Sequence, residues 1–151
     1  MKKEARDIIR ISGVEYPATV KDIPPSELKF WVDNPRIYSI VHATREPLSQ
    51  SEIEKELRKR DHVKELRNDI SHHGGVIHPL LVQSKNGVLE VIEGNSRLAA
   101  YRMLQEKDPI KWSAIRCRVV SDIPIKAIYS YLKQEHIKGC LLYTSPSPRD
   151  S

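Results

Sequence analysis

The segment Val91–Ala100 reads VIEGNSRLAA and passes from an apolar run into a helical pattern. The start of a helix carries unpaired amides and the positive end of the helix dipole, and both favour a bound anion. Gly94 has no Cβ to keep a phosphate away from the backbone, and Asn95 or Ser96 is a typical helix cap. Arg97 would add a planar guanidinium that pairs with two phosphate oxygens. The segment therefore predicts either a phosphate-binding turn or an ordinary capped helix with a surface arginine.

Two apolar runs precede this turn and predict a β-hairpin. The first is Val76–Val82 and the second is Val88–Ile92, with Asn86-Gly87 between them. An Asn-Gly pair between two such runs is a strong hairpin signal, because both residues tolerate positive φ. The chain would then enter the turn at Glu93 directly from the second strand.

Local sequence patterns predict the remaining helices and strands on either side of the hairpin and the turn. Ser49 and Glu52 form a predicted capping box that opens a helix, and Gly74 follows the periodic apolar positions of a second helix. Leu98, Tyr101 and Leu104 share one side of the helix after the turn. We predict strands at 7–12, 15–22 and 114–120, with a rigid turn at 23–28 and a loop around 34–35. We predict helices after 49, at 62–73, from 96 and at 124–138.

Composition sets wider limits on the class of protein. A chain of 151 residues allows one core domain but not two full ones. No apolar run approaches the roughly 20 residues of a membrane-spanning helix, and no signal peptide is visible, so we expect a cytoplasmic protein without membrane contact. The net charge of +5 favours a nucleic acid or phosphorylated partner, although a mixed surface of 25 basic and 20 acidic residues explains it equally well.

Cysteine and histidine spacing indicates neither a metal site nor a disulfide. Cys117 and Cys140 share no metal-ligand spacing with each other or with histidines. We predict that Cys117 is a buried or half-buried thiol in a strand. His72 and His73 fit a helix C-terminus better than a metal or catalytic role.

Two boxes in this order resemble a known family. GVIHPLLV at Gly75–Val82, followed by EGNSRLAA at Glu93–Ala100, looks like the paired boxes of ParB-type N-terminal domains in the ParB/sulfiredoxin superfamily. The earlier stretch from Ile23 to Arg36 is similar to the opening segment of that family. The resemblance implies an α/β (α+β) fold, a small mixed sheet flanked by helices, in a domain at 21–139 after an N-terminal extension at 1–20.

The second box departs from the family in ways that affect its chemistry. Partition proteins carry a glutamate and two further arginines where this chain has Asn95, Ser96 and Ala99, which implies weaker phosphate binding. The reactive cysteine of sulfiredoxins corresponds to Asn95, so that chemistry is excluded. Ser130 and Tyr131 replace a Glu-Asn pair that serves metal and nucleotide in partition proteins. The chain looks more like ParB-domain proteins that act outside chromosome partition.

The resemblance implies a nucleotide-binding domain of a DNA-associated partition or regulatory protein. CTP or ATP, with Mg²⁺, would bind a phosphate cradle of Gly94, Asn95, Ser96 and Arg97. The pocket would be lined by Gly75, His78, Pro79 and Arg36. Two alternatives stay open. The first is a phosphotransfer enzyme or nuclease with Glu93 as candidate base, and the second is a scaffold that keeps the fold for protein contacts without a ligand.

The last residues suggest a foreign origin. Residues 140–150 back-translate into a string that resembles the transposase adapter used in DNA library preparation. We therefore predict that 140–151 is an artefactual tail, with a natural Ser/Pro-rich linker as the alternative. The resemblance implies that a DNA-binding helical module would often follow Gly139, and here such a module either was cut away or never existed. Whether the chain forms a homodimer is left open.

Overall fold

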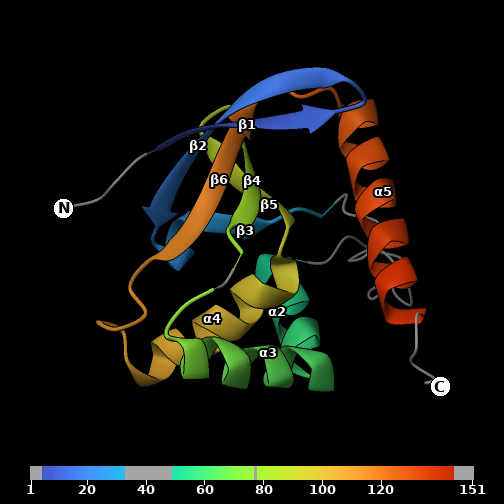
Figure 1. The fold of residues 1–151 in the computed structure, drawn as a ribbon. Coiled ribbons are helices and arrows are strands. Elements are labelled where there is room, and N and C mark those ends of the chain that lie inside the picture. Colours follow the sequence, from blue (N-terminus) through green and yellow to red (C-terminus); the bar gives the residue numbers. More distant parts are fainter. Residues whose placement is uncertain (1–4, 33–48, 77, 145–151) are drawn as a thin grey trace.

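A computed structural model describes residues 5–32, 49–76 and 78–144, which form one mixed sheet with helices around it (Figure 1). The elements, in chain order, are β1 (Ala5–Ile11), β2 (Val14–Ile23), the 3-10 turn η1 (Pro25–Glu27), β3 (Leu28–Phe30), α2 (Gln50–Arg58), α3 (Asp61–His73), β4 (Leu80–Lys85), β5 (Val88–Glu93), α4 (Asn95–Lys107), β6 (Ile115–Ser121) and α5 (Ile125–Thr144). The predicted α/β class and mixed sheet are confirmed.

The sheet has six strands in the order β1-β2-β6-β4-β5-β3. The neighbouring pairs β1/β2, β2/β6 and β4/β5 are antiparallel, whereas β4/β6 and β3/β5 are parallel. Strands β4 and β6 lie at the centre, and the chain between them forms β5 and α4. This order brings the end of β5 and the middle of β6 toward the same region of the molecule.

The β4–β5 hairpin forms as its sequence predicts. Asn86 and Gly87 take φ angles of 53° and 78° at its turn, as expected for the two central residues of a type I′ turn. The pairing register shifts between Leu81 and Val82, so that Ile92 is an extra residue in β5. Such a bulge bends the strand and increases its twist, and here it directly precedes the turn into α4.

One face of the sheet is covered by three helices. Helices α2, α3 and α4 lie together beneath the sheet (Figure 1). The predicted capping box is confirmed, because the Ser49 side chain accepts from the Glu52 amide and the Glu52 carboxylate accepts from the Ser49 amide. Apolar residues of these helices pack against the sheet in a first cluster that includes Ile53, Leu57, Val63, Ile70, Leu98, Tyr101, Leu104 and Trp112.

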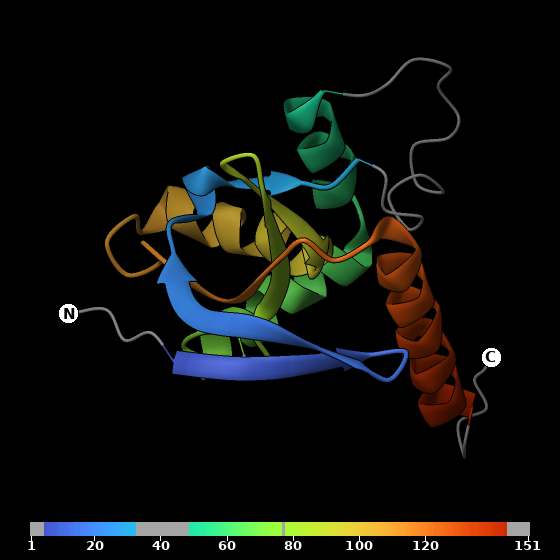
Figure 2. The same ribbon diagram turned by 90° about the horizontal axis from the view of Figure 1, so that it is seen from above.

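The opposite face carries a second apolar cluster with α5. Leu81 and Ile92 point to this face, and Ile128 of α5 packs against them while only 2% exposed. The far end of the β1–β2 hairpin reaches the first turns of α5 (Figure 2), where the hydroxyls of Ser12 and Ser130 are 3.3 Å apart. The central strand β4 is therefore buried on both faces, whereas most of the edge strand β1 is exposed.

Three sequence predictions are corrected by the structure. The strand expected at Val76–Val82 begins only at Leu80, because Pro79 directly before it has no N–H for the ladder. The turn expected at 23–28 also contains the start of β3, a strand whose three residues are too few to be recognised as a strand from their pattern. The helix expected at 124–138 continues to Thr144 and so crosses the predicted start of the tail.

The predicted boundary between residues 20 and 21 falls inside β2. That strand runs from Val14 to Ile23 and pairs with β1 on one side and β6 on the other. The N-terminal hairpin is therefore part of the central sheet. Within the described part of the chain, no helix is both long and apolar enough to cross a membrane.

Candidate functional site

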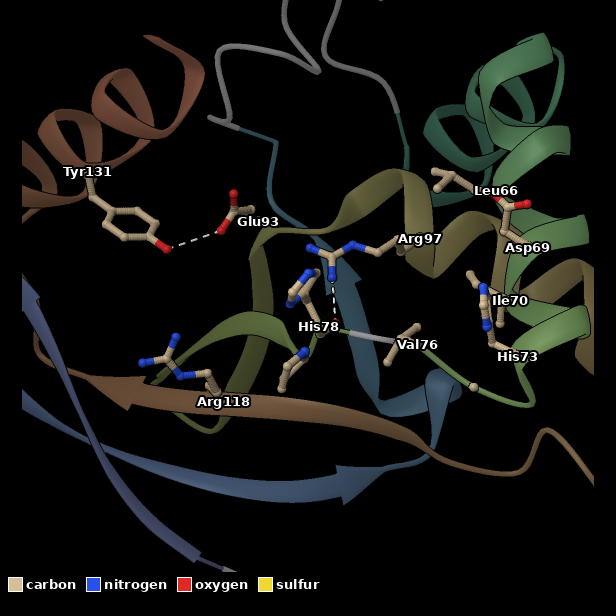
Figure 3. A pocket seen from close by; sticks show the side chains of 12 residues that line it. Leu66, Asp69, Ile70, His73, Val76, His78, Glu93, Arg97, Arg118 and Tyr131 are labelled. Atoms are coloured by element: carbon tan, nitrogen blue, oxygen red, sulfur yellow. Dashed lines mark hydrogen bonds between the residues drawn. The ribbon is translucent and has the colours of Figure 1, made fainter. Parts of the chain in front are cut away.

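A cavity of about 470 Å³ lies where α3, the lead-in to β4, the start of α4, β6 and α5 meet (Figure 3). This volume is in the range of small-molecule sites in proteins. The residues that line the cavity are Leu66, Asp69, Ile70, His73, Gly75, Val76, His78, Pro79, Glu93, Arg97, Arg118 and Tyr131. They come from five separate segments of the chain.

Arg97 is half-buried at the wall of this cavity, on the first turn of α4. Its Nη1 donates to the carbonyl oxygen of His78 at 2.5 Å, so the residue before Pro79 fixes the direction of the guanidinium. Burial lowers the pKa of Arg97, and the nearby Glu93 carboxylate raises it.

Three residues of the predicted phosphate cradle do not line the cavity: Gly94, Asn95 and Ser96. Gly94 is the N-cap of α4, with φ of 110°, and no side chain caps the helix. The expected cap by Asn95 or Ser96 is therefore wrong. Asn95 is buried, and its Nδ2 donates to the carbonyl oxygen of Val91 at 2.9 Å. Asn95 thus secures the bulged end of β5, and its buried Oδ1 accepts no hydrogen bond from the amides of α4.

Glu93 faces the cavity on the side opposite to α3. Its Oε1 accepts from the hydroxyl of Tyr131 at 3.2 Å (Figure 3). This hydrogen bond connects the last residue of β5 with α5. The Glu93 carboxylate is therefore accessible from the cavity, as a metal ligand or a general base must be. The hydrogen bond from Tyr131 sets its orientation.

Arg118 enters the cavity from β6, on the same side as Glu93 and Tyr131 (Figure 3). Its Nε lies 3.0 Å from Oδ2 of Asp7, and its side chain is 27% exposed. Nη2 also lies 3.5 Å from the carbonyl oxygen of Ile8. Arg118 is therefore linked to the N-terminal hairpin.

The wall formed by α3 is mainly apolar. Leu66 and Ile70 share one face of this helix, and Val76 continues the surface toward β4. His73 and Asp69 add polar edges on the same side (Figure 3). A flat apolar group fits this wall, while a charged group fits the side with the arginines.

Five residues singled out from the sequence come together in this cavity: Gly75, His78, Pro79, Glu93 and Arg97. Arg36 lies outside the described residues. Sequence reasoning did not select Arg118 or assign Tyr131 a place in the pocket. The sequence did contain a hint for Tyr131, because this residue occupies the position where the similar family has a pair of residues that serve metal and nucleotide. Arg118 looked like any charged residue of an alternating strand.

Several chemistries find no support in the described residues. No group of three or more His, Cys, Asp or Glu side chains is arranged to hold a metal ion by itself in the described part of the chain. Cys117 is a free buried thiol, as predicted, and burial raises its pKa to about 12. It is therefore protonated at neutral pH and is a poor nucleophile.

Neither a scan against protein-family models nor a search of curated proteins found a match to this chain.

Proposed function

We propose that this domain is ParB-like and binds the phosphates of CTP or ATP in the cavity between α3, α4 and α5. The observation that carries the proposal is the Arg97 guanidinium, which is fixed at the cavity wall by the His78 carbonyl beside the start of α4. A guanidinium held in place loses little conformational freedom when a phosphate binds. The amides at the start of α4 add a favourable field for a nearby anion.

The composition of the cavity supports a ligand with a charged end and a flat apolar end. Arg97 and Arg118 supply positive charge, and Leu66, Ile70 and Val76 supply an apolar wall for a base. The volume of about 470 Å³ accommodates a molecule of nucleotide size. Larger nucleic acid would have to bind elsewhere.

A magnesium ion fits the donor set as a companion of the phosphates. Mg²⁺ is commonly held by one or two protein carboxylates together with phosphate oxygens and water. Glu93 is the carboxylate that lines the cavity beside Arg97, and an ion there would relieve its repulsion from a phosphate. Asp69 lies on the α3 side and would remain near the base.

A role in a DNA-associated partition or regulatory protein belongs to the same proposal. It is supported by the resemblance of Gly75–Val82 and Glu93–Ala100 to the ParB-type boxes and by the net charge of +5. The cavity itself contributes nothing to the choice of a DNA sequence.

The test is calorimetric titration of the full chain with CTP, ATP and GTP in the presence of Mg²⁺. We expect saturable binding of CTP or ATP and a loss of about tenfold or more in affinity for Arg97→Ala, because a hydrogen bond to a charged group is removed. Arg97→Lys should recover only part of this loss, since lysine lacks the planar fork. Lys107→Ala, an exposed change on the same helix, should bind like the wild type.

Two results would contradict the proposal: no saturable binding of any nucleotide, or unchanged affinity in a folded Arg97→Ala variant. If the protein turns over the bound nucleotide and Glu93→Gln abolishes this turnover, the domain is a phosphotransfer enzyme instead. DNA cleavage that depends on a divalent metal would move it to a nuclease.

A further inference from the structure

We propose that Arg118 is a second phosphate ligand of this cavity and that Asp7, on the N-terminal hairpin, is its positioning residue. The inference rests on the proposed nucleotide function. It extends the site to the N-terminal hairpin, which the resemblance to ParB-type domains placed outside the domain at 21–139.

Arg118 reaches across one strand to meet Asp7. Strand β2 lies between β6 and β1 in the sheet, and Arg118 spans it to bring its Nε within 3.0 Å of Oδ2 of Asp7. The Nε atom is buried, and its N–H is not aligned for a hydrogen bond with Asp7 or any other group. The contact is therefore an ion pair that fixes the side chain by charge and leaves donor capacity on the guanidinium.

The guanidinium of Arg118 is placed to complete the charged side of the cavity. It lies on the side of Glu93 and Tyr131, with Arg97 between this side and the α3 wall (Figure 3). A phosphate chain that begins at Arg97 and runs away from the apolar wall would extend toward Arg118. The two arginines would then contact different phosphates of one ligand.

Charge balance makes both arginines necessary. The described lining residues with full charges are Arg97 and Arg118 against Asp69 and Glu93, so the formal charges cancel. Removal of one arginine leaves a negative wall, which repels a polyphosphate at close range. Loss of Arg118 should therefore weaken binding more than loss of an ordinary surface arginine.

Asp7 contributes by holding a long side chain in one place. A free arginine loses considerable rotamer freedom when a ligand immobilises it. The ion pair restricts Arg118 before the ligand arrives. Loss of Asp7 should therefore weaken binding through Arg118 alone, and should have no effect when Arg118 is absent.

The same hairpin offers a matched control. Arg10 and Glu15 form another ion pair, with side chains 68% and 51% exposed, and neither residue lines the cavity. An exposed pair of this kind contributes little to stability. Neutralising it changes the charge of the hairpin without touching Arg118.

The experiment is titration of the full chain with whichever of CTP and ATP binds, with Mg²⁺, at several salt concentrations. We expect Arg118→Ala to weaken binding about tenfold or more and to make affinity less sensitive to salt. Asp7→Ala should weaken binding roughly threefold to tenfold, and Asp7→Ala combined with Arg118→Ala should match Arg118→Ala alone. Arg10→Ala combined with Glu15→Ala should bind like the wild type.

The possible results distinguish a failure of this inference from a failure of the proposed nucleotide binding. If Arg97→Ala weakens binding and Arg118→Ala does not, the inference is overturned and nucleotide binding stands. Additive effects of Asp7→Ala and Arg118→Ala would refute the positioning role of Asp7. If the wild-type chain binds no nucleotide, both fail. Should Arg118→Ala not fold, Arg118→Lys and Asp7→Asn give the same comparison with smaller disturbance.

Discussion

Gly94 shows how packing at a single residue shapes the turn into α4. A Cβ at this position would lie 2.7 Å from Cγ of Leu80 and 3.1 Å from Nη2 of Arg97. Its φ of 110° is also in a region that residues with side chains rarely adopt. In this structure glycine is therefore needed to let β4 and the Arg97 side chain approach the turn.

We expect Gly94→Ala to destabilise the protein by roughly 2–4 kcal/mol, because backbone strain adds to a steric clash with a buried leucine. Urea unfolding followed by circular dichroism measures the change. Gly87→Ala is the control, since φ there is 78° but no atom lies within 4 Å of the added Cβ. It should cost only the strain, about 1–2 kcal/mol. Equal losses for the two variants would show that Leu80 does not crowd the turn.

Among the elements, α4 is tied to the chain before it by Arg102. The Nη1 atom of Arg102 lies 2.7 Å from Oε1 of Glu54 in α2. Nη2 donates to the carbonyl oxygens of Pro25 and Leu28, at 2.9 and 2.6 Å. The guanidinium also lies over the ring of Phe30, 5.1 Å from its centre. One side chain thus holds α2, η1 and β3 against α4.

Arg102→Met should destabilise the protein by about 3–5 kcal/mol, because it leaves a half-buried carboxylate and two carbonyl oxygens without their partner. Glu54 keeps a contact with Arg58, which favours the lower end of that range. Lys59→Ala is the comparison, since its pair with Glu56 is exposed and should contribute less than about 1 kcal/mol. Urea unfolding measures the free energy of unfolding of both variants. If Arg102→Met loses no more stability than Lys59→Ala, Arg102 does not hold these elements together.

For the whole molecule, the sheet joins two apolar clusters that lie on opposite faces. Adjacent residues of the central strands alternate between them, with Leu80 and Val82 in the first cluster and Leu81 in the second. Neither cluster can form without the strands that build the other. The molecule should therefore unfold as one unit.

The two tryptophans of the chain allow this to be measured, because Trp112 belongs to the first cluster and Trp31 to the second. In the variants Trp31→Phe and Trp112→Phe, the remaining tryptophan reports one face. In each variant, urea unfolding followed by fluorescence should have the same midpoint as unfolding followed by circular dichroism. A fluorescence transition that is separate in either variant would show that α5 and its face unfold independently.

The sequence by itself determined the local parts of this protein. Asn86-Gly87 specified the β4–β5 hairpin, Ser49 and Glu52 specified the start of α2, and Gly74 specified the end of α3. Each signal depends on backbone geometry within a few residues, so it can be read without the fold. Two short motifs contain five of the cavity residues, so these could be selected from the sequence: Gly75, His78, Pro79, Glu93 and Arg97.

Tertiary structure decided the rest of the candidate site. Arg118 and Tyr131 line the same cavity as Glu93 only because β6 lies beside β4 and α5 packs on the second face of the sheet. Asn95 resembled a helix cap, but the bulge in β5 offered it the carbonyl of Val91. Strand β3 is formed by pairing with β5, since three residues carry too little local preference. These features depend on contacts between distant segments, which the order of residues along the chain does not reveal.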